Sequence, residues 1–249
     1  GIAPLLAWRK TSVKSLKRNF LIPVCVSIFI GIIIFYLGIT KIYPLITLVL
    51  IGFVLVTILL EFYRGTCARM RTHNEQVFTA FLSIIKKNQS RYGGYIVHIG
   101  ILMMFFGFVG KAFDKEADIS IIPNETIELE NYTIHYKKYW LETPDTNPND
   151  REHHFAKIIS LEILKDLKPF TMLYPEKRFY IDQNNQPHSE VALKSTLLED
   201  FYVVLGDVDM NTGLATLIIK INPMVSWVWI GSLLLCIGVI ICLNPKMKL

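Results

Sequence analysis

Four runs of about twenty residues with few or no charges dominate this 249-residue chain. An α-helix rises about 1.5 Å per residue, so a helical run of this length crosses the hydrocarbon core of a bilayer. No small-residue cleavage site follows the first run, and three more runs come later, which excludes a cleaved signal peptide. The sequence therefore predicts a polytopic α-helical membrane protein with four transmembrane helices, at Phe20–Thr40, Tyr43–Leu60, Tyr92–Val109 and Val225–Leu243.

The charges outside these runs predict a topology. The segment before the first run carries five bases and no acid, and the segment between the second and third runs carries six bases against Glu61 and Glu75. Residues 111–222 instead carry 12 bases and 19 acids, a net charge of −7. Short basic loops stay in the cytoplasm, so we expect both termini inside and residues 111–222 outside. The net charge of +5 then reflects topology, and no nucleic-acid partner is expected.

The exported region has the pattern of a β-domain. From Ile119 to Ile221, alternating apolar residues are separated by turn residues, which is typical of short antiparallel strands. We expect an extracytoplasmic antiparallel sandwich or small barrel, inserted between the third and fourth transmembrane helices. The expected strands are Ile119–Ile122, Thr126–Tyr139, Ala156–Leu164, Phe201–Leu205 and Leu214–Ile221, with a turn at Pro123-Asn124 and a loop over Thr143–Asp150.

These patterns divide the chain into seven segments. The first begins with Gly1, and Ile2–Trp8 reads like the tail of another apolar helix, so we expect a fragment or one product of a split gene. The segments are a cytoplasmic basic segment with the tail of a missing upstream helix (1–19), transmembrane helices 1 and 2 (20–63), a cytoplasmic loop with an amphipathic helix over Val77–Lys87 (64–91), transmembrane helix 3 (92–113), the β-domain (114–222), transmembrane helix 4 (223–243) and a cytoplasmic tail (244–249).

The cysteines exclude two kinds of chemistry. Cys25, Cys236 and Cys242 lie in apolar runs and Cys67 lies in the inner loop, so the exported domain has none. That domain therefore forms no disulfide and performs no thiol exchange of its own. The chain has no CxxCH motif and cannot hold a covalent c-type haem.

The third run holds the residue that most suggests function. His98 is the only histidine in any of the four runs, and an ionisable side chain at that depth is costly enough to mark a functional site. Gly94 lies four residues earlier on the same helical face and leaves space beside the imidazole. On spacing alone, a hydrogen bond between helices and axial ligation of a haem iron are equally compatible with His98. Small residues repeat every seven positions on a second stripe that permits close helix packing, at Gly93, Gly100 and Gly107.

Several segments of the chain, in order, resemble the C-terminal part of the CcmF family, the haem-lyase subunit of cytochrome c maturation, with NrfE as a close relative. The segments are Arg91-Tyr92-Gly93-Gly94-Tyr95-Ile96-Val97-His98-Ile99-Gly100, Phe105–Gly110, Gly1–Arg9, Tyr174–Tyr180 and Asn222–Gly231. The resemblance covers nearly the whole chain. It does not include the family's tryptophan-rich haem-binding segment or the two histidines that flank it, which lie upstream of this region.

The resemblance implies a place in haem attachment. The family receives haem from a periplasmic haem chaperone and, with a thiol-handling subunit, joins it to the CxxCH motif of apocytochrome c. It also holds a b-type haem in the membrane, and His98 matches one of the axial ligands. The second ligand is then expected from the missing upstream half or a split-gene partner, with substrate haem bound transiently. The implied location is the bacterial inner membrane with the β-domain in the periplasm, or alternatively the mitochondrial inner membrane.

Other candidates are weaker. His73 falls in the inner loop, and His135, His153, His154 and His188 fall in the exported domain, where we interpret them as surface residues. Trp8, Trp227 and Trp229 lie near run ends and suit the membrane interface. No catalytic residues can be assigned, so the chain is not expected to be catalytic alone. Two alternatives remain, a haem-free scaffold whose β-domain assembles the maturation complex, and a permease or sensor.

Overall fold

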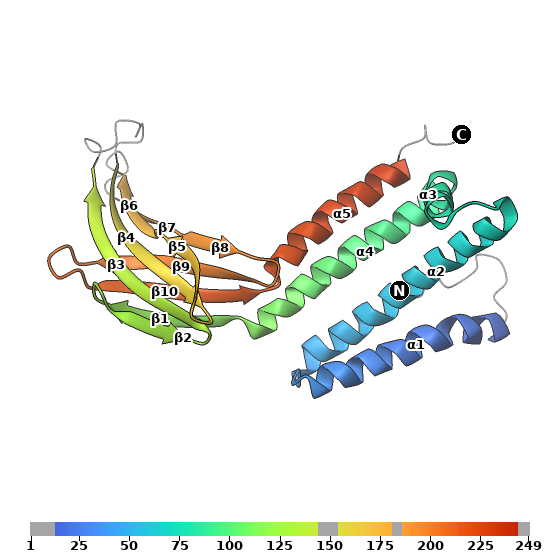
Figure 1. The fold of residues 1–249 in the computed structure, drawn as a ribbon, viewed down its shortest axis with the longest axis horizontal. Coiled ribbons are helices and arrows are strands. Elements are labelled where there is room, and N and C mark those ends of the chain that lie inside the picture. Colours follow the sequence, from blue (N-terminus) through green and yellow to red (C-terminus); the bar gives the residue numbers. More distant parts are fainter. Residues whose placement is uncertain (1–12, 144–153, 181–185, 244–249) are drawn as a thin grey trace. The chain divides into compact units, whose positions relative to one another are not determined.

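The computed structural model describes residues 13–143, 154–180 and 186–243 (Figure 1). The chain separates into two compact units, residues 1–112 with 224–249 and residues 113–223. We refer to them as the helical unit and the β unit. The helical unit contains α1 (Val13–Tyr36), α2 (Ile42–His73), α3 (Val77–Lys87), α4 (Gln89–Gly110) and α5 (Val225–Leu243), and a 3-10 turn, η2 (Lys111–Phe113), follows α4.

Three helices in the described part of the chain are long and apolar enough to cross a membrane: α2, α4 continued through Phe113, and α5. The first predicted span is shorter than expected, because its described apolar helix covers only Phe20–Tyr36. The helix ends there since Gly38 takes a left-handed backbone, with φ of 95°, in the turn that follows. The described residues therefore support three of the four predicted spanning helices, and the fourth remains a prediction.

The predicted inner loop is mostly helical. Helix α2 continues past Leu60 to His73 and ends at Asn74, whose left-handed backbone (φ 53°) caps the helix through its N–H to the Met70 carbonyl. Assigning residues 64–73 to a loop was therefore wrong, because the charges there do not interrupt the helix. Arg69 donates two hydrogen bonds, at 2.7 and 2.6 Å, to Glu75 and closes the turn. The predicted amphipathic helix Val77–Lys87 is confirmed as α3.

Helices α4 and α5 approach so closely that only glycine fits at their crossing points. A Cβ atom on Gly100 would lie 2.6 Å from the carbonyl oxygen of Gly231 and 2.6 Å from the backbone nitrogen of Leu235. One on Gly93 would lie 3.1 Å from the carbonyl oxygen of Gly238. The predicted glycine stripe is therefore confirmed as a packing surface, and α5 supplies a matching stripe, spaced by the same seven residues, that sequence reasoning did not use.

The β unit consists of two antiparallel sheets. One sheet has the strand order β1-β10-β9-β8, and the other has the order β2-β3-β4-β6-β7 with β5 also paired to β4. The strands are β1 (Lys115–Ile121), β2 (Thr126–Leu129), β3 (Tyr132–Glu142), β4 (His154–Lys165), β5 (Lys168–Leu173), β6 (Glu176–Tyr180), β7 (Gln186–Glu190), β8 (Ala192–Ser195), β9 (Glu199–Val208) and β10 (Ala215–Pro223). One apolar core contains inward-facing residues of both sheets.

The strands of the β unit differ in part from the expected ones. The predicted strand Thr126–Tyr139 is wrong as a single strand, because the chain reverses at Glu130, where φ is 57°, and forms the β2–β3 hairpin. The predicted loop Thr143–Asp150 lies outside the described residues except for Thr143. Strands β5 to β8 were not expected.

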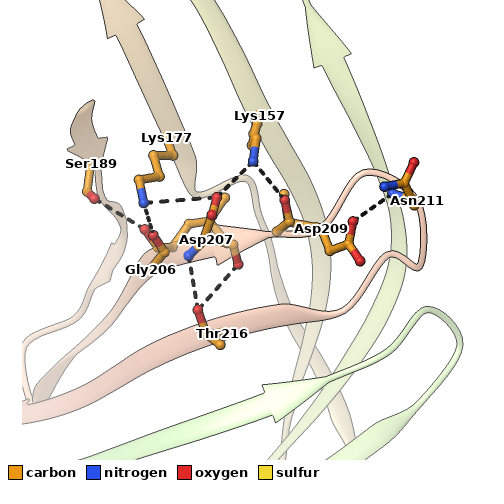
Figure 2. A network of polar contacts seen from close by, with 10 residues as sticks. Lys157, Lys177, Ser189, Gly206, Asp207, Asp209, Asn211 and Thr216 are labelled. Carbon is orange, nitrogen blue, oxygen red and sulfur yellow. Dashed lines mark hydrogen bonds and ion pairs between the residues drawn. The ribbon is translucent and has the colours of Figure 1, made fainter. Parts of the chain in front are cut away.

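Two lysines of one sheet form ion pairs with a carboxylate of the other (Figure 2). Lys157 of β4 and Lys177 of β6 are direct cross-strand partners, an arrangement that would be repulsive alone. Asp207 of β9 relieves it, with its Oδ1 at 3.0 Å from Lys157 Nζ and 3.9 Å from Lys177 Nζ. Burial would raise the pKa of the Asp207 carboxyl, but the hydrogen bond from Lys157 helps to hold that pKa below its usual range.

A second ion pair links the sheets at Glu199 of β9. Its Oε1 accepts a hydrogen bond of 2.7 Å from the Tyr132 hydroxyl and pairs with Lys165 of β4. Burial alone would raise the pKa of Glu199, but these two hydrogen bonds outweigh it and lower that pKa. A carboxyl with a lowered pKa in the folded state stabilises the fold above its unfolded pKa, and that contribution is lost as pH falls through the folded pKa.

The β unit, expressed alone as residues 113–223, should therefore fold and show acid-sensitive stability. Changing Glu199 to Gln should lower its free energy of unfolding at pH 7 by about 1 to 3 kcal/mol and flatten the loss of stability below pH 5. Urea unfolding followed by circular dichroism measures both effects. Glu130→Gln is the control, since Glu130 pairs with Lys115 only at the surface, with both side chains 49% exposed. A helix-dominated spectrum, or equal effects of the two changes, would contradict this prediction.

Candidate functional site

Helix α4 presents three different faces within the helical unit. One face packs against α5 through its glycines. A second face packs against α2 and α3, where Tyr92 and Tyr95 join Phe62 in a buried aromatic cluster. The third face is apolar and, among the described residues, open around His98; farther along α4, Phe105 and Phe108, 51% and 55% exposed, line a hollow with the first turns of α2. The candidate site lies on this open face.

The His98 ring is oriented by its own helix. Its Nδ1 lies 2.7 Å from the carbonyl oxygen of Gly94, one turn earlier. A carbonyl oxygen only accepts hydrogen bonds, so the ring proton belongs on Nδ1 and the lone pair is on Nε2. Histidines that bind metals commonly donate their second ring nitrogen to a backbone carbonyl in this way. The exposed imidazole is thus arranged as a neutral ligand whose Nε2 points away from the bond to Gly94.

Gly94 leaves open space next to this ring. A Cβ atom built on Gly94 would meet no atom within 4 Å, whereas one on the adjacent Gly93 would lie 2.7 Å from Cys242 Sγ. Packing within the described helical unit therefore requires glycine at position 93 but not at position 94. The residues predicted to act together, His98 and Gly94, do lie together, beside a space that a flat group could enter.

A charged cluster that sequence reasoning missed fixes α4 against α2. Glu61, 13% exposed, pairs with Arg91 of α4 and with Arg64, the latter at 3.5 Å. Arg91 also donates a hydrogen bond of 3.0 Å to the Tyr95 hydroxyl. The signal was available, since Glu61 is the first acid after the second apolar run, but a span ending at Leu60 placed it in a loop. This cluster holds the N-terminal part of α4, about two turns before His98.

The remaining candidates do not join the site. His73 is exposed at the end of α2, His188 is exposed on β7, and His135 on β3 bonds to Thr126 at 3.0 Å. His153 and Trp8 lie outside the described residues, and His154 begins β4. Trp227 contacts Phe106 edge to face and Trp229 is 73% exposed. Over residues 13–143, 154–180 and 186–243, no three His, Cys, Asp or Glu side chains gather as a metal site.

Comparison with known proteins agrees with these features. Residues 112–223 match the family model described as the CcmF C-terminal β-sandwich. The chain is 28% identical to the cytochrome c-type biogenesis protein CcmF of Haemophilus influenzae over 99% of its own length and 36% of that protein. It is 27% identical to NrfE of the same organism over 60% of the chain and 22% of that protein. The chain thus spans about a third or less of the curated relatives it matches.

A solved structure shares the fold of both units. The cytochrome c heme lyase CcmF matches 98% of this chain and 37% of its own, with a TM-score of 0.69 and 18% identity. At that identity the likeness supports the fold alone. The fold of this neighbour agrees with the β-sandwich match and with the sequence relatives. The β unit thus matches the CcmF C-terminal β-sandwich, and the whole chain is similar to the C-terminal portion of the CcmF/NrfE-type cytochrome c biogenesis proteins.

Proposed function

We propose that this chain is the C-terminal part of a cytochrome c haem lyase subunit and provides one axial ligand, His98, to a b-type haem in the membrane. The observation that carries the proposal is the His98 geometry. An imidazole on an open intramembrane face has its Nδ1 bound to the Gly94 carbonyl and its Nε2 available. A side chain that served only to join two helices would be expected to lie in a helix contact instead.

Two features of the residues around His98 fit a bound haem, the orientation of the ring and the space beside it. His98 would bind iron through Nε2, with its ring oriented by the Gly94 carbonyl, and the missing side chain of Gly94 would leave room beside it. The close packing of α4 on α5 holds the helix that carries the ligand. When bound, such a haem supplies one-electron redox chemistry. Met103 and Met104 lie on the same helix as His98 and cannot reach the opposite side of the iron, so the second ligand comes from another helix.

The β unit fits a docking role in this proposal. Haem transfer from a haem chaperone to the CxxCH motif of apocytochrome c requires several partners to meet, including a thiol-handling subunit. The β unit holds no cysteine, so any thiol that reacts there must belong to another part of the assembly. The net charge of −7 over residues 111–222 favours basic partners and speeds their encounter. We place the β unit in the bacterial periplasm.

Topology can be tested by labelling. A cysteine at Glu128, exposed on β2, should react with a membrane-impermeant maleimide in intact cells, in a background without the four native cysteines. The short basic loops require this side to be extracytoplasmic. A cysteine at Phe78, 72% exposed on α3, is the control and should react only after lysis. The reverse pattern would overturn the predicted orientation.

Haem binding should require the upstream half of the family's chain. The chain alone offers one intramembrane histidine, and a tightly held six-coordinate b-type haem needs two strong ligands. Purified alone, the chain should bind haem weakly, and co-expressed with an upstream half from a CcmF protein it should show a low-spin b-type optical spectrum. Stoichiometric low-spin haem in the chain alone would contradict the proposal.

A further inference from the structure

Both connections of the β unit to the spanning helices leave from the same end of its sandwich. Strand β1 begins at Lys115, five residues after the end of α4, and β10 ends at Pro223, two residues before the start of α5. The two strands are hydrogen-bonded neighbours, with Lys115 opposite Ile221 (Figure 1). Connections this short keep that end of the sandwich, which we call the membrane-proximal end, close to the bilayer that α4 and α5 enter.

Three hairpin turns lie at this same end, β2–β3, β4–β5 and β8–β9. Pro223 pairs with Glu199, the first residue of β9, so the β8–β9 turn lies beside the exit of β10. The Glu199 side chain forms an ion pair with Lys165, the last residue of β4, so the β4–β5 turn lies next to the β8–β9 turn. The backbone nitrogen of Asp166 in that turn also donates to the carbonyl of Asn131, at 2.9 Å. The membrane-proximal end is therefore a tied group of turns with a defined structure.

The β4–β5 and β8–β9 turns have exposed leucines at their tips, whereas the β2–β3 turn carries Glu130 and Asn131. Leu167 in the β4–β5 turn is 79% exposed, and Leu197 and Leu198 in the β8–β9 turn are 61% and 72% exposed. The Thr196 hydroxyl accepts hydrogen bonds from the backbone nitrogens of Leu198, at 3.2 Å, and Glu199, at 3.1 Å. Because the turn's polar backbone is bound within the turn, its two leucines can enter an apolar phase without leaving those groups unpaired.

Leu167 breaks a local rule that the fold gives no reason to break. Asp166 and Leu167 have φ of 49° and 62°, two successive left-handed residues that form a tight hairpin turn. Such positions favour asparagine and glycine, and a bulky side chain there is strained. Because Leu167 is 79% exposed, burial of its side chain in the β unit does not offset that strain. Rules broken without gain to the fold are expected at functional positions.

The β9–β10 turn, which joins the far ends of β9 and β10, has the opposite character. Its exposed tip residues are polar, Asn211 and Thr212, and Met210 packs against the core of the sandwich, while Leu214, just before β10, is 44% exposed. Thr212 donates a hydrogen bond of 2.7 Å to Asp209, as in an ordinary solvated turn. The tip of this turn is thus polar, whereas two of the three turns at the membrane-proximal end have exposed leucines at their tips.

We propose that Leu167, Leu197 and Leu198 insert into the lipid interface on the side from which the β unit emerges. Apolar side chains held at the surface of a bilayer gain by entering the boundary between headgroups and acyl chains. Charge contributes little, because Lys115 and Lys165 are paired with Glu130 and Glu199, and the exposed Lys168 is balanced by the exposed Asp166 of the same turn. Insertion is therefore expected to be independent of anionic lipid. The proposal needs α4 and α5 to span the membrane but does not depend on haem binding.

The test places an environment-sensitive fluorophore on single cysteines in the full chain, with Cys25, Cys67, Cys236 and Cys242 replaced by serine. Reconstituted in phosphatidylcholine vesicles, a dye at Leu198→Cys should emit at shorter wavelength than one at Asn211→Cys. Quencher-labelled acyl chains should quench it at least about fivefold more strongly. Replacing a third of the lipid with phosphatidylglycerol should leave both signals unchanged.

Three outcomes would overturn the proposal. The first is equal emission and quenching at positions 198 and 211. The second is a blue-shifted dye at 198 that lipid-bound quenchers do not reach, which would mean that protein covers the leucines. The third comes from Leu167→Gly, which should leave the melting temperature of the chain unchanged or raise it while lowering lipid quenching at 198. If that change instead lowers the melting temperature, Leu167 serves the fold.

Discussion

Replacing His98 with alanine is expected to remove the low-spin b-type spectrum of the complex formed with the upstream half, and to lower cytochrome c maturation at least about tenfold. Loss of one axial ligand leaves the iron with a single strong protein ligand, so any haem retained should become high-spin. Optical spectra of the purified complex and haem staining of a reporter cytochrome measure the two effects. The effect should be large because the helical unit offers no second intramembrane histidine over its described residues.

A matched pair of variants separates ligation from structure. His98→Gly leaves a gap that exogenous imidazole can enter, so added imidazole should restore part of the low-spin signal. His73→Ala, at the exposed end of α2, should leave the spectrum unchanged. A low-spin spectrum that survives His98→Ala would exclude His98 as the ligand, and loss of the whole complex from the membrane would mean that His98 serves assembly.

Changing Gly100 to alanine is expected to destabilise the helical unit by about 1 to 3 kcal/mol or more, although it adds a single methyl group. The new Cβ would lie 2.6 Å from the carbonyl oxygen of Gly231 and 2.6 Å from the nitrogen of Leu235. Both are backbone atoms, so α4 and α5 must move apart and lose their contact. Melting temperature in detergent and the yield of monodisperse protein measure the loss.

The same helix provides the control. Gly94→Ala adds the same methyl group where nothing lies within 4 Å, so the melting temperature should not change. If haem occupies that space, Gly94→Ala should still reduce the low-spin signal of the assembled complex. Equal stability of the Gly100 and Gly94 variants would show that the close approach of α4 to α5 is not what holds them together.

Much of this architecture can be read from the sequence because bilayers impose simple rules. Apolar length predicts spanning helices, and a seven-residue glycine period predicts which face of α4 packs closely. The same logic would have identified Gly231 and Gly238 on α5 as the partner surface. The lengths of α1 and α2 were harder to predict. Helix α2 continues past the charged residue Glu61, and α1 ends before Gly38 although the apolar run continues beyond it.

The small strands were missed for a different reason. Sequence patterns detect a strand by one buried and one exposed face, and β7 is exposed along its whole length while β6 is half-buried at every position. The turn at Glu130 lacks the glycine that signals a hairpin, so β2 and β3 read as one strand. The sequence indicated that an ionisable side chain at position 98 is costly in a membrane, but it could not show what surrounds that side chain. The open face around it depends on which sides of α4 the other helices cover.

The pairing of β1 with β10 has a consequence for how the molecule is made. Helices α4 and α5 pack on each other, yet 114 residues separate Gly110 from Val225. At about 5 to 20 residues per second, a ribosome needs roughly 6 to 23 s to synthesise that interval, and α4 waits in the membrane without its partner. The β1–β10 ladder brings the two ends of the interval together, so completion of the last strand delivers α5 to α4. Folding of the β unit is thereby expected to set the time at which the glycine surfaces can meet.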